Sequence, residues 1–284
     1  MAYQPHWQRK LWRSPKVWVA GMVLGIIILG ALVAPLWPQA PNAQNLFATL
    51  KPPGFIYKGS QYVLGTDQLG RDVVSRLLHG ARVSLTVGLS AVGLASVLGT
   101  SLGIAAGYLR GWVDNLITAL TETLLTLPFI IFAIAIIAAL GSSLTVVILT
   151  LGLTSWVSFA KLTRARVIEL RHEDYILASK ALGSSETRIM TRHILPNVFP
   201  LVIVDASLQL GTLMLAEAGL SFLGLGIQPP TPTWGSMLAE RRQTSKQSHT
   251  KKDRQSDRQT DRDRQTETDR QRDRHSYRQT EIDR

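Results

Sequence analysis

The sequence of 284 residues contains no cysteine, which excludes a disulfide framework and a thiolate metal site. Its six histidines show no spacing typical of metal ligands, and no Ser/His or Asp/Asp pair stands out, so we predict no metal site and no catalytic residue. The sequence also lacks a glycine-rich loop ending in Gly-Lys-Ser/Thr. We therefore expect neither a bound cofactor nor ATP binding by the chain itself.

Charge is missing from several long stretches. Residues 17–37 and 83–109 carry no charged side chain, and residues 123–160 form an uncharged run of 38. That run is too long for one crossing of a hydrocarbon core about 30 Å thick, so we expect it to be broken at Gly141-Ser142-Ser143. The sequence predicts an all-α polytopic membrane protein with five transmembrane helices, at residues 17–37, 83–109, 116–140, 144–160 and 198–219.

The basic residues fix an expected orientation. Four of them before position 17 place residues 1–16 in the cytoplasm by the positive-inside rule, and the first apolar run is too long for a cleaved signal peptide. Residues 38–82 then lie outside, with an amphipathic helix expected at 67–82 along the interface and capped by Gly65-Thr66-Asp67. Residues 161–197 lie inside. We expect a multi-pass protein of the cell (inner) membrane, in contact with lipid.

The last 44 residues differ from all that precede them. They cycle through Asp-Arg-Gln-Thr, which is the translation of a repeated GACA tetranucleotide, and contain almost no apolar side chains. We interpret residues 241–284 as a disordered repeat tail of artefactual origin, the alternative being a disordered tail that binds a partner. The net charge of +11 does not indicate nucleic acid, because the remaining charges lie between apolar stretches and do not cluster on a polar face.

The loop at residues 161–197 is predicted to form two short helices. The first is expected at residues 169–182, where apolar residues repeat at helical spacing on one face, and Gly183 follows where a left-handed residue commonly ends a helix. Ser184 or Ser185 can cap a second helix, which Pro196 is expected to end. A plain connector needs only about 2–8 residues. The greater length of this loop favours a rigid surface for docking.

Three motifs resemble one family. Residues 178–183 (Ala-Ser-Lys-Ala-Leu-Gly) and 193–197 (His-Ile-Leu-Pro-Asn) resemble the "EAA" loop of binding-protein-dependent ABC transporter permeases. Residues 64–85 and 217–235 are similar to the dipeptide/oligopeptide/nickel, or DppC/OppC-like, branch of that family. The resemblance implies that residues 83–240 are the permease core and that the loop couples to an ATPase through Glu173, Tyr175, Leu177, Ala178, Lys180, Ala181, Gly183, His193, Leu195 and Pro196.

The resemblance implies that the chain functions in an ABC importer. This chain would form half of the pore, for peptides or a related small solute, with a second permease subunit, two ATP-binding cassette subunits that hydrolyse ATP, and an external solute-binding protein. Two departures stand out. Leu177 occupies the position of the family's glutamate, which neighbouring Glu173 can replace, and no sixth membrane helix follows residue 240. Impaired transport by a truncated permease is therefore expected, and a secondary transporter or another polytopic membrane protein is the remaining alternative.

Polar side chains within the apolar runs are costly in hydrocarbon and are expected to face a pore or one another. Asp205 and Gln209 share one face of the fifth predicted helix, Glu217 lies about 80° round that helix from Gln209, and Glu122 lies at the start of the third. We predict that these four residues line the transport pathway. The alternative places Asp205 and Glu122 at the headgroup boundary, where water hydrates them.

Overall fold

The computed structural model describes residues 15–242. By its internal contacts the chain divides into two units, Met1–Met237 and Leu238–Arg284, of which the first contains the helices described below. The predicted cytoplasmic segment before residue 15 and the repeat tail from residue 243 onward lie outside the described residues.

The first apolar run forms α2 (Pro15–Val33), followed by a 3₁₀ turn, η1 (Ala34–Leu36). The predicted span of 17–37 is therefore shifted by a few residues, because Pro35 lacks the N–H that would continue the α-helical ladder. Most side chains of α2 are exposed apolar groups, as expected of a helix surrounded by lipid. Near its end, α2 packs on the next helix, where Gly30 adjoins Leu78.

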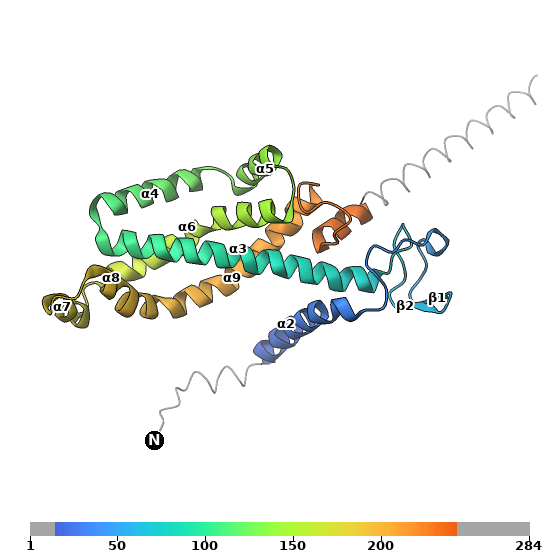
Figure 1. Cartoon of the computed structure of the whole chain (residues 1–284), viewed down its shortest axis with the longest axis horizontal. Coiled ribbons are helices and arrows are strands. Elements are labelled where there is room, and N and C mark those ends of the chain that lie inside the picture. Colours follow the sequence, from blue (N-terminus) through green and yellow to red (C-terminus); the bar gives the residue numbers. More distant parts are fainter. Residues whose placement is uncertain (1–14, 243–284) are drawn as a thin grey trace, which may run out of the picture. The chain divides into compact units, whose positions relative to one another are not determined.

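The longest helix of the first unit, α3 (Val73–Leu109), corrects the prediction of a separate amphipathic helix at residues 67–82. Nothing between Val73 and Leu109 breaks the helix, so the amphipathic segment and the apolar run share one axis (Figure 1). Its cap is Asp72 rather than the predicted Gly65-Thr66-Asp67. The Asp72 carboxylate accepts hydrogen bonds from the backbone N–H of Ser75 and from Trp37 Nε1, each at 2.9 Å.

A seam of glycines on α3 allows close approach of α6 (Leu144–Leu170). Gly99, Gly103 and Gly107 recur every four residues on one face of α3. A Cβ on Gly103 would lie 2.6 Å from the carbonyl oxygen of Ala160, and one on Gly107 would lie 2.8 Å from Cβ of Val167. Small residues at this spacing are typical of tightly packed membrane helices. The glycines of this seam therefore serve helix packing.

The third predicted span is broken into α4 (Gly111–Thr126) and α5 (Phe129–Leu140), which meet at an angle of 90°. The break lies at Leu127 and Pro128, both of which have extended ψ angles, at 126° and 123°. Proline lacks the backbone N–H and disfavours helical geometry in the residue before it. A single straight helix at residues 116–140 was therefore a wrong prediction. The break at Gly141, before α6, is confirmed.

The fourth and fifth predicted spans continue beyond the apolar runs. Helix α6 extends to Leu170, ten residues past the expected end. The fifth span is α9 (Leu195–Phe222), which follows α8 (Glu186–Ile189) and a π-helical turn, η3 (Met190–Ile194), without interruption. The prediction that Pro196 ends the second helix of the loop is wrong, because the helix continues past it. It occupies the first turn of α9, directly after the π-turn, where the regular hydrogen-bond ladder already changes.

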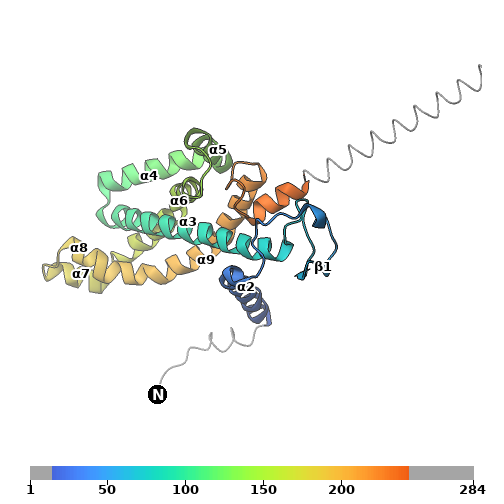
Figure 2. The same ribbon diagram turned by 45° about the vertical axis from the view of Figure 1, so that its right-hand side comes forward.

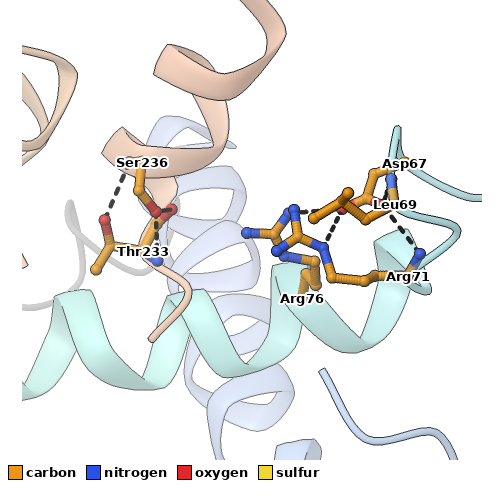
Figure 3. A network of polar contacts seen from close by, with 6 residues as sticks. All are labelled: Asp67, Leu69, Arg71, Arg76, Thr233 and Ser236. Carbon is orange, nitrogen blue, oxygen red and sulfur yellow. Dashed lines mark hydrogen bonds and ion pairs between the residues drawn. The ribbon is translucent and has the colours of Figure 1, made fainter. Parts of the chain in front are cut away.

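The loop before α3 has structure of its own. It contains a 3₁₀ turn, η2 (Leu46–Ala48), and an antiparallel pair, β1 (Phe55–Tyr57) and β2 (Ser60–Tyr62). Asp67 holds this loop against α3 by accepting from Arg71 Nε at 2.6 Å and Arg76 Nη1 at 2.7 Å (Figure 3). Burial acts to raise the pKa of Asp67, but the hydrogen bonds and charge of Arg71 outweigh it and hold that pKa below its ordinary value.

Within residues 15–242, four helical segments are long and apolar enough to span a membrane, and the bent pair α4–α5 brings the number to five. The fold class, an all-α polytopic membrane protein, is confirmed. Helices α3, α6 and α9 pack side by side, and α4 returns along α3 and α6 (Figures 1 and 2). One end of this bundle carries α7 (Asp174–Ala181) and α8, which belong to a helical hairpin. The other end carries β1 and β2.

Candidate functional site

The hairpin, residues 171–197, begins where α6 ends at Leu170 and a short turn leads into α7. The predicted helix at 169–182 is therefore shorter, because this turn separates it from α6. Gly183 ends α7 with φ of +81°, as predicted, and donates to the carbonyl of Lys180 at 3.0 Å. Ser184 donates to the carbonyl of Ser179 at 3.1 Å, which completes a Schellman motif. Ser185 is the N-cap of α8 but makes no side-chain capping bond.

The inner face of the hairpin is packed and hydrogen-bonded. Ile176 of α7 is buried, as are Ile189 and Ile194 on the opposite arm. The Tyr175 and His193 rings lie 6.3 Å apart, and Asn197 Nδ2 donates to the His193 carbonyl at 2.7 Å and to the Tyr175 hydroxyl at 3.4 Å. These contacts join α7 to the start of α9 and hold the two arms of the hairpin together.

The outer face presents apolar groups to solvent. Leu182 is 87% exposed and Leu177 is 50% exposed, so the single apolar face predicted for this segment is divided between an inner and an outer side. Glu173 lies one turn before Leu177, on the same side of α7. The remaining predicted coupling residues also lie on this hairpin, with an exposed position for Ala178, Lys180, Ala181, Gly183, Leu195 and Pro196.

A charged joint that the sequence analysis missed lies beside the hairpin. Asp114, at the start of α4, accepts from Arg164 Nε at 2.5 Å and from Arg164 Nη2 at 3.0 Å. Arg110, at the end of α3, approaches the same carboxylate at 3.2 Å. Three helices therefore meet on one carboxylate. The sequence carries a weak signal for it, since Arg110 and Asp114 have the i, i+4 spacing of a helical ion pair.

The four predicted pathway residues do not form one cluster. Glu217 is fully buried and accepts from Ser221 Oγ at 2.7 Å and from Ser84 Oγ on α3 at 3.2 Å. Its burial gives it a packing role in this chain, so it lines no open surface here. Ser221 also lies 3.4 Å from the hydroxyl of Thr233, whose turn is held by hydrogen bonds with Ser236 (Figure 3).

Asp205 and Gln209 are both half-buried on α9, which agrees with their shared face, and Asp205 interacts with the Ser158 hydroxyl on α6. Glu122 is exposed on α4, near the end of that helix rather than at the start of the span. It lines a cavity with Lys161 and Arg164 of α6. A role in the pathway stays a prediction for these three residues. Within the described part of the chain, no group of three or more His, Asp or Glu side chains could hold a metal ion.

Comparison with known proteins gives a consistent result. The family described as "Binding-protein-dependent transport system inner membrane component" matches residues 99–245. The dipeptide transport system permease protein DppC of Alkalihalophilus pseudofirmus is 41% identical over 233 residues, 81% of this chain and 75% of that protein. The di/tripeptide transport system permease protein DppC of Pseudomonas aeruginosa is 41% identical over 220 residues, 76% of this chain and 72% of that protein. The glutathione transport system permease protein GsiD of Pectobacterium atrosepticum is 36% identical over 239 residues, 82% of this chain and 78% of that protein.

Proposed function

Since this chain belongs to the family of binding-protein-dependent transport system inner membrane components, we propose that its hairpin is the surface on which a separate ATPase subunit docks. The chain is a permease subunit of an ABC importer of the peptide-transport branch. It supplies membrane helices and lacks a phosphate-binding loop in its sequence, so the energy for transport comes from another polypeptide.

The observation that carries this proposal is the exposed apolar surface of the hairpin. Leu177 and Leu182 stand in a segment that lies beyond the apolar runs, where their exposure to water is unfavourable. Exposed apolar groups rimmed by polar ones mark protein interaction sites. Lys180 and Glu173 provide such a rim. A partner that covers Leu177 and Leu182 removes the unfavourable exposure.

The arms of the hairpin give the docking surface a mechanical connection to the bundle. One arm continues into α6, and the other continues through η3 into α9. Arg164 of α6 is bound to Asp114 of α4, so displacement of the hairpin moves α4 along with α6. We infer that closure of the ATPase on the hairpin is transmitted as a rigid-body movement of these helices.

The full assembly that we propose has two permease subunits, two ATP-binding cassette subunits and an external solute-binding protein. In it this chain forms half of the pore, with its N-terminus and hairpin in the cytoplasm and the loop before α3 outside. The relatives named above are permeases for dipeptides, di/tripeptides and glutathione. Their names support a short peptide or a peptide-like solute as the substrate.

Cysteine crosslinking tests the docking surface directly, because the chain has no cysteine of its own. In the full chain assembled with its partner subunits, Leu182→Cys should crosslink to the ATPase with a short thiol reagent. Leu64→Cys, on the loop at the other end of the bundle, is also exposed and serves as the matched control. A complex that transports its solute with no crosslink at residue 182 would refute the proposal.

A further inference from the structure

Glu122 and Lys161 are the charged residues that flank the uncharged run of 38 residues, and the fold brings them back together. They line one cavity of about 300 Å³ between α4 and α6. Thr118 and Thr121 of α4 line the same cavity, which gives it hydroxyl groups in addition to charges of both signs. Neither the hairpin nor its docking function uses this cavity.

The charges of this cavity differ in what they contact. Arg164 also lines it; its guanidinium is bound to Asp114 at 2.5 Å, and its charge attracts Glu122 from beyond ion-pair distance. Among residues 15–242, neither Glu122 nor Lys161 has an ion-pair partner within 4.0 Å, and both side chains are exposed. Exposed charges of opposite sign that line one cavity without an ion pair between them are available to a ligand that carries both signs.

We propose that this cavity binds the two charged ends of a short peptide. Glu122 receives the α-ammonium group, and Lys161 receives the α-carboxylate. An anionic ligand would be repelled by Glu122 and a metal cation by Lys161, so a zwitterion is the chemical class that satisfies both. The inference rests on the proposed function, which it deepens by naming free peptide termini as the groups recognised within the permease.

The size of the cavity supports a short ligand. A volume of about 300 Å³ is at the lower end of the range for ligand pockets. Two extended residues span about 7 Å, which suits a cavity that lies between two neighbouring helices. Phosphatidylethanolamine also carries an ammonium group and an anion, so the headgroup of this lipid shares the chemistry and must be distinguished by experiment.

Protection of a single cysteine from labelling tests the site. Thr118→Cys introduces the only thiol of the full chain, which is then assembled with its partner subunits, without nucleotide and without the solute-binding protein. We expect a dipeptide with free termini to slow maleimide labelling at least about fivefold at saturation. The N-acetyl dipeptide and the dipeptide amide should not slow it. Thr123→Cys, which is exposed on the same helix but does not line the cavity, should label equally with every peptide.

Charge-neutral variants then assign the two ends. In the Thr118→Cys background, Glu122→Gln should raise the dipeptide concentration for half-protection about fivefold and remove the discrimination against the N-acetyl peptide. In the same background, Lys161→Gln should raise the dipeptide concentration for half-protection about fivefold and remove the discrimination against the dipeptide amide. Equal protection by all three peptides, or a Thr118→Cys thiol that does not label without peptide, overturns the proposal.

Two further readouts separate this inference from its alternatives. Slow labelling that depends on phosphatidylethanolamine in nanodiscs, with no effect of dipeptide, assigns the cavity to lipid and overturns the peptide site. ATP hydrolysis stimulated by the solute-binding protein is measured on the same preparations. If that stimulation is intact and the dipeptide gives no protection, the peptide site is wrong while the proposed ABC function stands.

Discussion

Replacing Asp114 by asparagine should loosen the joint that ties α4 to α6. The Asp114 side chain is 8% exposed, and it holds Arg164, which is 33% exposed, through two hydrogen bonds. Arg110 approaches the same carboxylate but is 45% exposed, so solvent screens most of its contribution. Asparagine keeps the size of the side chain and removes its charge, so the change isolates the electrostatic part of the joint.

The expected loss in the free energy of unfolding lies between two limits. Breaking a buried ion pair by removing one partner costs about 3–5 kcal/mol, whereas an exposed pair contributes about 0.2–1 kcal/mol. Because the carboxylate is buried and Arg164 is one-third exposed, we expect Asp114→Asn to cost about 2 kcal/mol. For a chain of this size that corresponds to a fall in Tm of about 4–8 °C.

Thermal unfolding of the detergent-solubilised chain measures this loss, and the same helix offers a matched control. Arg166 and Glu169 form an ion pair on α6 in which both side chains are exposed, at 40% and 65%. Glu169→Gln should lower Tm by less than about 2 °C. In the double variant Asp114→Asn/Arg164→Gln the two losses should not add, because both changes remove one interaction. If Asp114→Asn lowers Tm no more than Glu169→Gln does, the joint contributes nothing and the reasoning fails.

Three further predictions concern packing, the hairpin and pH. Gly99→Ala should destabilise the chain by about 1–3 kcal/mol, since its Cβ would lie 2.5 Å from Cβ of Phe159, whereas Gly93→Ala should be neutral because nothing lies within 4 Å there; Tm measurements compare the two. Gly183→Ala, at φ +81°, should weaken stimulated ATP hydrolysis more than Gly183→Asn, because asparagine tolerates the left-handed region; equal effects would contradict a conformational cause. The pKa of Asp67 is lowered in the folded chain, so its ionised form stabilises the loop before α3 above about pH 3.8, and this contribution is lost as pH falls through the folded pKa. The rate of hydrogen exchange in residues 45–72, divided by the intrinsic rate at the same pH, should therefore rise below about pH 3.8 in the parent chain. Asp67→Asn should abolish this change.

Local signals in the sequence predicted much of the hairpin. Gly183 was identified because few other residues adopt a positive φ, and that preference needs no information from distant residues. The π-turn before Pro196 could not be predicted in the same way. Proline indicates the end of a regular helix, but whether the chain stops or accommodates the ring depends on how the two arms pack. The helix therefore continued where the local signal favoured an end.

Hydropathy predicted the number of apolar segments better than their shape. A window over residues 116–140 is apolar throughout, and apolarity carries no information about direction, so the right-angle break at Pro128 was missed although the proline itself was visible. The roles of the membrane charges were harder still. Buried Glu217 accepts a hydrogen bond from Ser84, 133 positions away, and only the packing of α3 on α9 brings the two together. Such contacts have no local signature.

Helix α3 is longer than a bilayer requires. Its 37 residues extend over about 55 Å, compared with a hydrocarbon core of about 30 Å. One end is fastened to Trp37 through the Asp72 cap, and the other end adjoins Arg110 and the charged joint. A stiff rod held in this way converts a tilt of about 5° into a shift of about 5 Å at its far tip. In the assembly proposed above, a partner that docks at either end of the bundle would therefore act on the other end through this single helix.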